Sequence, residues 1–231
     1  MIIKANYNIP MSKKLFYTKK ICRLCKSHSL EEVLNLGKTP VGDDYQKIFN
    51  KKNPTFDLIL NKCKECGFTQ LSNVIDADFV YGEYLYVTKT SSGLPDHFKK
   101  LVDLLINKKI IFKNCKVLEV GSNDGTLLKY LNQKKCNVLG VDPAKEVVKH
   151  IDKKLKTINN NFSYKLSKKI SSQYGKFDLV IANNVIANID NLDDIFKSIR
   201  NLLKENSYFV METFSLFGII KNNLIDNIYH E

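Results

Sequence analysis

Apolar residues follow two spacings along the chain, and each spacing predicts a different element. Between residues 97 and 109 they recur every three or four positions, which predicts the buried face of an amphipathic helix. Short apolar runs at 116–121, 137–142, 177–185 and 207–214 are typical of buried strands instead.

Helical patterns separate these strands. They occupy residues 125–135, 144–154 and 192–204, and residues 156–162 can form one more strand. Strands that alternate with helices pair in parallel, because each crossover helix returns the chain to the same edge of the sheet. The pattern predicts an α/β fold of the Rossmann-like class, with a doubly wound, mostly parallel sheet.

Changes in this pattern predict four segments. Residues 1–20 are expected to form a flexible polar extension, and residues 21–80 a small domain rich in turns and cysteines. Residues 81–97 link that domain to the α/β domain, which runs from 98 to 231.

The composition excludes several classes of protein. Apolar residues make up 44% of the 231 positions, enough to bury a core, so the chain is not predicted to be disordered. No run of 18 apolar residues is present, and the start of the chain lacks the apolar stretch of a secretory signal. We expect a cytoplasmic protein without a membrane partner.

The net charge of +12 would suit a polyanionic partner such as nucleic acid. Only Arg23 and Arg200 are arginines, however, and arginine is the residue favoured for phosphate and base recognition. The lysine excess indicates a compositional bias of the whole chain. Nucleic acid is therefore not the expected partner, although it stays open as an alternative.

Four cysteines in two C-x-x-C pairs predict a metal site. Each pair, Cys22 with Cys25 and Cys63 with Cys66, can hold one metal ion from a single tight turn. Two such turns complete a tetrahedral shell of four thiolates, which leaves no open position, so the zinc ion is expected to be structural. Buried free thiols or a redox dithiol are the alternatives.

The segment LEVGSNDGTLLKYL carries the main chemical signal. A strand ends at Gly121, a polar turn leads to Gly125, and a helix follows, so that backbone N–H groups can face a ligand. Glu119 precedes the loop, and Asp142 closes the next strand, where a carboxylate can accept both ribose hydroxyls of an adenosine cofactor.

The loop favours S-adenosylmethionine over a dinucleotide. A dinucleotide needs G-x-G-x-x-G for its pyrophosphate, whereas this loop reads E-x-G-x-x-x-G with an acid, Asp124, inside the turn. A turn of this kind suits the sulfonium and ammonium groups of S-adenosylmethionine, and an ordinary strand–helix turn is the alternative. The further residues predicted to bind the cofactor are Ser122, Asn123, Pro143, Phe162, Asn183 and Asn184. For Phe162, packing in the core is an equal alternative to flanking an adenine ring.

Six motifs occur in one order: ICRLC…KCKECG, YLYVTKTSSGLPDHF, EVGSNDG, GVDPA, ANNV and IYHE. Together they resemble the zinc-containing sugar C-methyltransferases, a family that acts on nucleotide-linked keto-deoxysugars. The resemblance runs from about residue 21 to the last residue. It implies a class I methyltransferase domain after a zinc-binding domain, a nucleotide-sugar substrate, and a role in the biosynthesis of a polysaccharide or other glycoconjugate.

The resemblance also implies a mechanism. A base removes the proton next to a ketone, and the enolate carbon attacks the methyl group of the cofactor. The residues that match family positions around the sugar are Tyr84 or Tyr86, Tyr229, His230 and Glu231. His97 matches a family histidine too, with a surface position as its alternative.

Two departures from the family bear on activity. Asn188 stands where family members have a histidine after the ANNV turn, and an amide cannot act as a base at neutral pH. The second histidine of the family's Y-H-E-H motif and its C-terminal domain have no counterpart here. Three hypotheses follow: a sugar C-methyltransferase, a cofactor-binding fragment that needs a separate C-terminal polypeptide, and an RNA methyltransferase with a zinc module.

Overall fold

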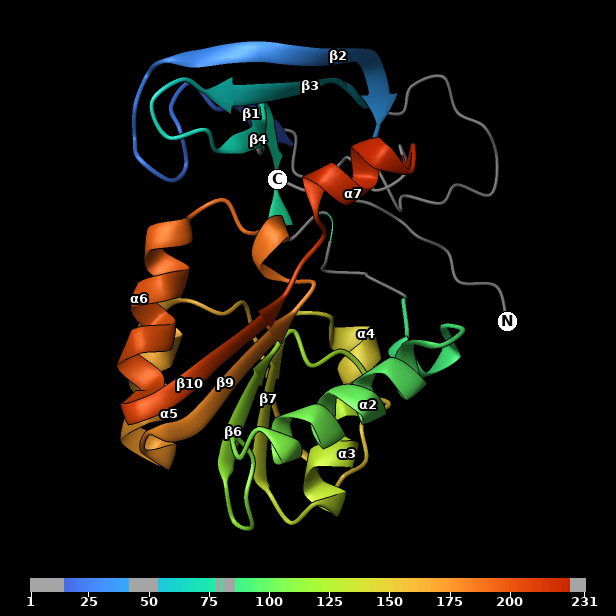
Figure 1. The fold of residues 1–231 in the computed structure, drawn as a ribbon, viewed down its shortest axis with the longest axis vertical. Helices are drawn as coiled ribbons and strands as arrows, with labels where there is room; N and C mark the ends of the chain where they lie inside the picture. The colour runs from blue at the N-terminus through green and yellow to red at the C-terminus, as the bar shows by residue number, and fades with distance from the viewer. Residues whose placement is uncertain (1–14, 42–53, 78–79, 81–85, 225–231) are drawn as a thin grey trace.

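The computed structural model describes residues 15–41, 54–77, 80 and 86–224. Two bodies follow each other along the chain, a small antiparallel β module at the N-terminal side and a larger α/β domain (Figure 1). The strands of the small module are β1 Phe16–Thr18, β2 Leu30–Pro40, β3 Thr55–Cys63, β4 Thr69–Leu71 and β5 Asn73–Ile75.

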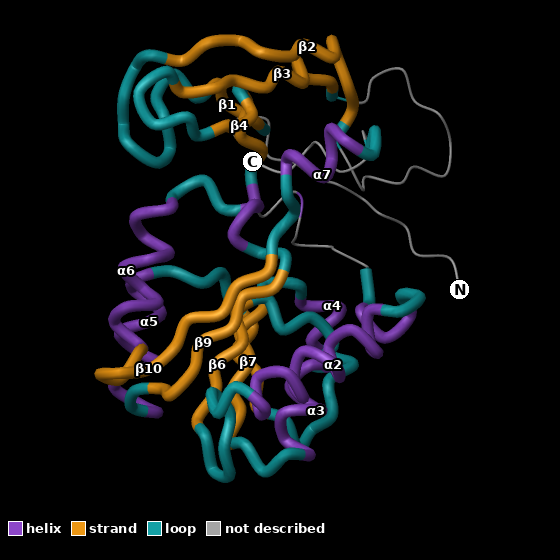
Figure 2. The backbone as a smooth tube through the Cα atoms, viewed as in Figure 1, coloured by secondary structure: helices purple, strands orange, loops and turns teal. Residues whose placement is uncertain are grey.

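The α/β domain is built on a five-stranded parallel sheet (Figure 2). Its strands are β6 Lys116–Val120, β7 Asn137–Asp142, β8 Lys156–Asn159, β9 Phe177–Asn183 and β10 Leu203–Glu212. They lie in the order β10-β9-β6-β7-β8, and every neighbouring pair is parallel. The strand order reverses between β6 and β9, so ligands are expected at the carboxyl ends of these two strands. The Rossmann-like fold predicted from the sequence is confirmed.

Helices cover both faces of this sheet. They are α2 Leu94–Asn107, α3 Thr126–Gln133, α4 Lys145–Val148, α5 Tyr164–Tyr174 and α6 Leu192–Leu202. Successive side chains of β9 point to opposite faces of the sheet. Leu179 and Ile181 pack with α2 and α3, whereas Val180 and Ala182 pack with α5 and α6. This period of two explains why the central strands read as continuous apolar runs.

The N-terminal module has its own small core. Strands β2, β3 and β4 form one antiparallel sheet, and β1 pairs with β5. The buried core consists of Val41, Phe56, Leu58, Leu60 and Leu71. Helix α7, Leu216–Lys221, lies beside this module rather than on the parallel sheet, and its Leu216 packs against the same core (Figure 1).

The structure differs from the predicted elements in several places. The helix predicted over 144–154 is only the single turn of α4, and the chain then turns to reach β8 at Lys156. Helix α5 was not predicted, because its buried side chains are only Ser167 and Ile170. The predicted flexible extension ends in β1, so its last described residues are part of the fold.

Among the described residues, no helix combines the length and apolar character needed to cross a membrane.

Candidate functional site

The four cysteines of the two C-x-x-C pairs converge on one point of the N-terminal module. Their sulfur atoms all lie within 4.8 Å of one another. Cys22 Sγ is 3.7 Å from Cys66 Sγ, and Cys25 Sγ is 3.5 Å from Cys63 Sγ. A tetrahedral zinc ion with Zn–S bonds of about 2.3 Å needs sulfur atoms roughly 3.8 Å apart. The quartet therefore fits a structural zinc ion.

Both turns hold their cysteines with the same backbone geometry. The residue after each pair has a positive φ, 65° at Lys26 and 76° at Gly67. In the first turn the amide of Lys26 donates to the Cys22 carbonyl at 3.0 Å, and in the second the amide of Gly67 donates to the Cys63 carbonyl at 2.9 Å. Glycine adopts this conformation without strain, which explains why a glycine suits position 67.

The glycine loop lies at the carboxyl end of β6. Gly121 has φ 73°, and a Cβ atom built on it would lie 2.2 Å from Cγ2 of Val185, the last residue of the ANNV turn. Gly125 has φ 76° and is the N-cap of helix α3. Glycine is required at 121 by both its backbone conformation and the close approach of the neighbouring turn.

Asp142 ends β7 next to this loop and is 94% buried, with 6% of its surface exposed. Its Oδ2 accepts a hydrogen bond from the Asn123 amide at 2.8 Å, and its Oδ1 accepts one from the Ala144 amide at 2.8 Å. Burial raises the pKa of Asp142, although the two amides act against that shift. The carboxylate is thus fixed in orientation, as a group that accepts two ribose hydroxyls must be.

Several buried polar atoms at this edge have no hydrogen-bond partner in the described part of the chain. They are Oε2 of Glu119, Oγ of Ser122 and both amide atoms of Asn183. Buried polar atoms are normally satisfied, and each one left unsatisfied costs about 1–3 kcal/mol. Glu119 lies on β6, Ser122 in the loop just after it and Asn183 on β9, where the strand order reverses. This placement fits a polar ligand that supplies the missing partners, as S-adenosylmethionine would.

The side chains of Asn123 and Asp124 face a different segment. Asn123 Nδ2 donates to the Tyr86 carbonyl at 2.9 Å, and its Oδ1 accepts from the Thr88 amide at 2.9 Å. Asp124 Oδ2 accepts from the Lys89 amide at 3.1 Å, and its Oδ1 accepts from the Thr126 hydroxyl at 2.7 Å. The polar turn of the loop therefore holds the segment 86–90, which we name the strap.

Hydrogen bonds to β10 and within the turn itself fix the turn after β9. Asn184 has φ 55°, its amide donates to the Glu212 carbonyl at 2.7 Å, and its own carbonyl accepts from Asn188 Nδ2 at 3.2 Å. Pro143 is half-buried, and Phe162, also half-buried, packs against the core under α5 and α6. For Phe162 the structure thus shows core packing.

A histidine–glutamate pair lies beside this turn. His97, in the first turn of α2, places its Nε2 2.6 Å from Oε2 of Glu212, the last residue of β10. Glu212 pairs in register with Asn183, so the imidazole is held at the same sheet edge as the unpartnered amide. The sequence pointed to His97 but not to Glu212, because 115 positions separate the two and no local pattern joins them.

Four predicted site residues, Tyr84, Tyr229, His230 and Glu231, lie outside the described residues. Tyr86 is described and is 42% exposed at the start of the strap. The roles of all the predicted site residues stay predictions.

Family models match almost the whole described chain in two parts. A model of a zinc binding domain matches residues 22–81, and a model of a methyltransferase domain matches residues 92–228. The chain belongs to the methyltransferase-domain family. The two matches confirm the expected combination of a zinc-binding domain with a methyltransferase domain.

This methyltransferase-domain chain is similar to the C-methyltransferase NovU from Streptomyces niveus, with 29% identity over 216 residues. The match covers 91% of this chain and 51% of NovU, so the chain spans about half the length of that relative.

Solved structures are similar in part. A protein from Pyrococcus horikoshii OT3 has a TM-score of 0.49 at 21% identity, over 61% of this chain and 63% of its own. A SAM-dependent methyltransferase from Archaeoglobus fulgidus has a TM-score of 0.45 at 22% identity, over 68% of this chain and 67% of its own.

Proposed function

We propose that this chain is an S-adenosylmethionine-dependent methyltransferase that methylates carbon in nucleotide-linked keto-deoxysugars, in polysaccharide or glycoconjugate biosynthesis. The observation that carries the proposal is the match to a C-methyltransferase over 91% of the chain, through the zinc module and the cofactor loop together. The unpartnered atoms of Glu119, Ser122 and Asn183 support it, since they mark where a polar cofactor is needed.

When bound, S-adenosylmethionine supplies an electrophilic methyl group. In the proposed site Asp142 would orient the ribose, and Glu119 and Asn183 would make further hydrogen bonds to the cofactor. A fixed cofactor matters because carbon–carbon bond formation requires the attacking carbon to lie in line with the methyl group.

His97 is the proton acceptor in this proposal. Glu212 holds Nε2 of the imidazole, which leaves Nδ1 to take the proton from the carbon next to the ketone. The electron pair of the broken C–H bond would form the enolate. Its carbon would take the methyl group as the methyl–sulfur bond breaks, and the sulfur would keep that electron pair in S-adenosylhomocysteine. Asn188 cannot replace this base, because its amide donates to Asn184 and does not bind protons at neutral pH.

A turnover assay tests the proposal. Zinc-loaded protein is mixed with S-adenosylmethionine and a panel of nucleotide-linked ketosugars, and formation of S-adenosylhomocysteine and of a methylated sugar is followed by mass spectrometry. Methylation at a carbon next to the ketone is expected. Methyl transfer to oxygen, or to RNA and to none of the sugars, would show that the acceptor is wrong.

A second candidate is a cofactor-binding subunit that works with a separate C-terminal polypeptide. It is favoured by α7, where Phe217 is 74% exposed and Ile220 is 63% exposed. Two large apolar side chains exposed on one short helix are typical of a surface that another polypeptide covers. Turnover that appears only when the C-terminal half of NovU is added as a separate chain would support this candidate. Turnover by the chain alone would exclude it.

A further inference from the structure

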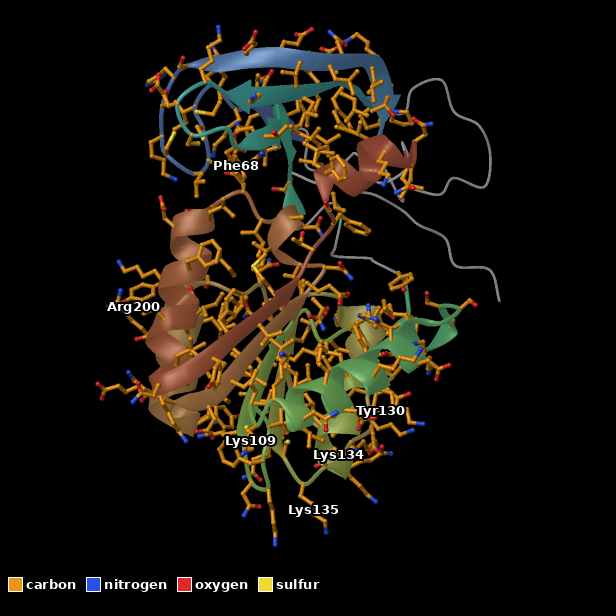
Figure 3. All side chains as sticks on the ribbon, viewed as in Figure 1. Phe68, Lys109, Tyr130, Lys134, Lys135 and Arg200 are labelled. Atoms are coloured by element: carbon orange, nitrogen blue, oxygen red, sulfur yellow. The ribbon has the colours of Figure 1, made fainter. Side chains whose placement is uncertain are left out.

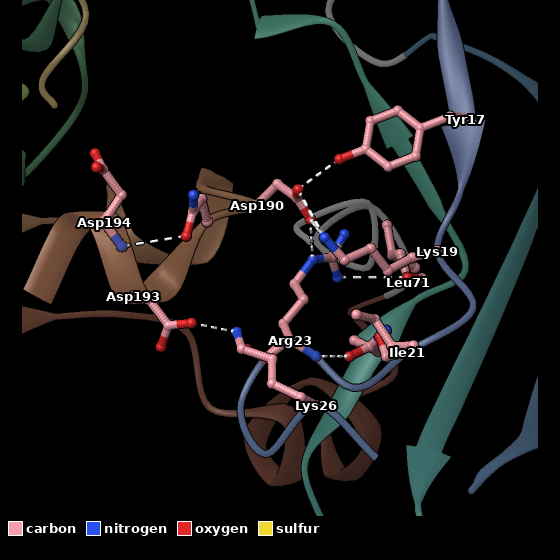
Figure 4. Close-up of polar contacts among 11 residues, drawn as sticks. Tyr17, Lys19, Ile21, Arg23, Lys26, Leu71, Asp190, Asp193 and Asp194 are labelled. Atoms are coloured by element: carbon pink, nitrogen blue, oxygen red, sulfur yellow. Dashed lines mark hydrogen bonds and ion pairs between the residues drawn. The ribbon is translucent and has the colours of Figure 1, made fainter. Parts of the chain in front are cut away.

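The first zinc turn reaches into the methyltransferase domain through one buried arginine. Arg23 lies between Cys22 and Cys25 and is 1% exposed. Its Nε donates to Oδ1 of Asp190 at 2.9 Å (Figure 4). A guanidinium this deeply buried needs a fixed acceptor, since an unpaired buried charge is strongly destabilising.

Asp190 collects donors from three positions of the N-terminal module. Besides Arg23, the ammonium group of Lys19 lies 2.8 Å from the carboxylate, and the Tyr17 hydroxyl donates to Oδ2. Burial acts to raise the pKa of Asp190, but the bonds from Lys19, Tyr17 and Arg23 outweigh it and hold that pKa below its usual range. We name these four residues the interdomain clasp.

The second zinc turn supports the same contact. Gln70, in β4, accepts from the Arg23 amide at 2.8 Å and donates to the Ile21 carbonyl at 3.1 Å, so it fixes the backbone on either side of Cys22. Phe68, two residues after Cys66, points from the module toward the α/β domain and packs against the core under α5 and α6 (Figure 3). Both metal-holding turns therefore contact the larger domain.

Asp190 lies just after the Asn183–Asn188 turn, which borders the proposed cofactor site. It lies two residues after Asn188, in the short connection between that turn and α6. The turn begins at Asn183 and Asn184 on the sheet edge and ends at the clasp. Its first end is held by the sheet and its second end by the zinc module.

We propose that Arg23 and Asp190 are positioning residues through which the zinc site sets the affinity for S-adenosylmethionine. Without the metal, the four thiols no longer fix the turn that carries Arg23. Asp190 then loses its anchor, and the Asn183–Asn188 turn is freed from the edge it borders. The inference rests on the proposed function only in taking S-adenosylmethionine as the ligand.

The test is a titration of S-adenosylmethionine into four forms of the full chain: zinc-loaded and chelated wild type, and zinc-loaded and chelated Asp190→Asn. Chelation and the substitution should each weaken binding at least tenfold. Together they should weaken it no more than either alone, because they break one connection. Asp193→Asn is the matched control: its partner Lys26 comes from the same zinc turn, but their side chains are 69% and 48% exposed, and binding should stay unchanged.

Hydrogen exchange supplies a readout that does not depend on the cofactor. The Asn188 amide donates to the Val185 carbonyl at 2.9 Å, and its exchange should quicken on chelation and in Asp190→Asn. Circular dichroism checks that the parallel-sheet domain stays folded, and Lys19→Gln removes only one bond of the clasp if Asp190→Asn does not fold. An exchange rate and affinity that chelation leaves unchanged would overturn the inference. Faster exchange without cofactor binding in any form would instead count against the proposed function.

Discussion

Gly121 is the residue at which two constraints meet, a positive φ and a neighbour inside the space of a Cβ atom. Gly121→Ala is therefore expected to destabilise the domain more than the backbone cost of about 1–2 kcal/mol alone. Gly93 is a matched control, because its φ is 84° but nothing lies within 4 Å of its Cβ position. In chemical denaturation, Gly121→Ala should have a lower free energy of unfolding than Gly93→Ala. Adding Val185→Ala to Gly121→Ala should recover part of the lost stability. Equal losses in the two alanine variants would contradict the contact.

Glu119 is buried beside two other acids, which predicts how its charge affects stability. Burial, and then the nearby Asp142 and Asp124, raise its pKa well above the usual value. An acid with a raised folded-state pKa contributes stability below its unfolded pKa of about 4.3, and that contribution is lost as pH rises through the folded pKa. Glu119→Gln should therefore flatten the decline in unfolding free energy above about pH 4.3, by about 1.4 kcal/mol for each unit of pKa shift removed.

The same variant should weaken cofactor binding, because in the proposed site the Glu119 carboxyl group bonds the cofactor. Urea denaturation between pH 4 and 8 and a cofactor titration measure the two effects. If the unfolding free energy of the variant fell with pH as it does in the wild type, the titration of Glu119 would not cause that decline.

His97 is expected to act in proton removal and not in cofactor binding. His97→Asn should lower turnover by a factor on the order of 100 or more, as is usual for loss of a general base. Deuterium uptake from solvent by the ketosugar should slow equally, while the affinity for S-adenosylmethionine stays the same. His150→Asn, at an exposed position, is the control. If His97→Asn took up deuterium into the ketosugar as fast as the wild type, another group would be the base that removes the proton.

The strap is held by two side chains of the glycine loop: Asn123 makes two of the three bonds and Asp124 makes the third. Asn123 bonds the backbone of Tyr86 and of Thr88, in the way that a neighbouring strand would. Lys89 is already exposed, but trypsin also needs a mobile backbone. Asn123→Ala should release the strap, so that limited proteolysis cuts after Lys89 faster than in the wild type. Asn123→Asp keeps the acceptor for Thr88 and should give an intermediate rate. Unchanged cleavage would show that the strap is held by other contacts.

The helices and strands of the sheet followed from apolar spacing, because a parallel sheet buried on both faces needs continuous apolar runs. Helix α5 did not, since Ser167 and Ile170 are its only fully buried side chains and Leu166 and Tyr174 are only partly buried against the core. The glycine loop, Asp142 and the cysteine quartet could also be predicted, because their chemistry depends on spacing within short segments. The His97–Glu212 pair and the clasp join positions 115 and 167 apart, and only the folded chain brings them together.

In the molecule as a whole, the zinc site and the proposed cofactor site lie where the N-terminal module meets the α/β domain. The zinc module stands over the carboxyl edge of the parallel sheet (Figure 1), and Arg23 and Phe68 fix it there. Arg23 is thus occupied within the protein, which leaves Arg200 as the exposed arginine, on α6 (Figure 3). Little of the +12 charge is therefore available as exposed arginine, the side chain favoured for phosphate and base recognition.

Calorimetric titration of S-adenosylmethionine into the zinc-loaded chain, with Asp142→Asn and Asp142→Ala as variants, tests the account most directly. The wild type should bind one molecule, and both variants should bind at least tenfold more weakly, since each loses charged hydrogen bonds worth about 1.5–3 kcal/mol apiece. Circular dichroism and zinc content confirm that each protein is folded. Folded, zinc-loaded wild type that shows no binding, or variants that bind as tightly as the wild type, would contradict a cofactor site at this edge of the sheet.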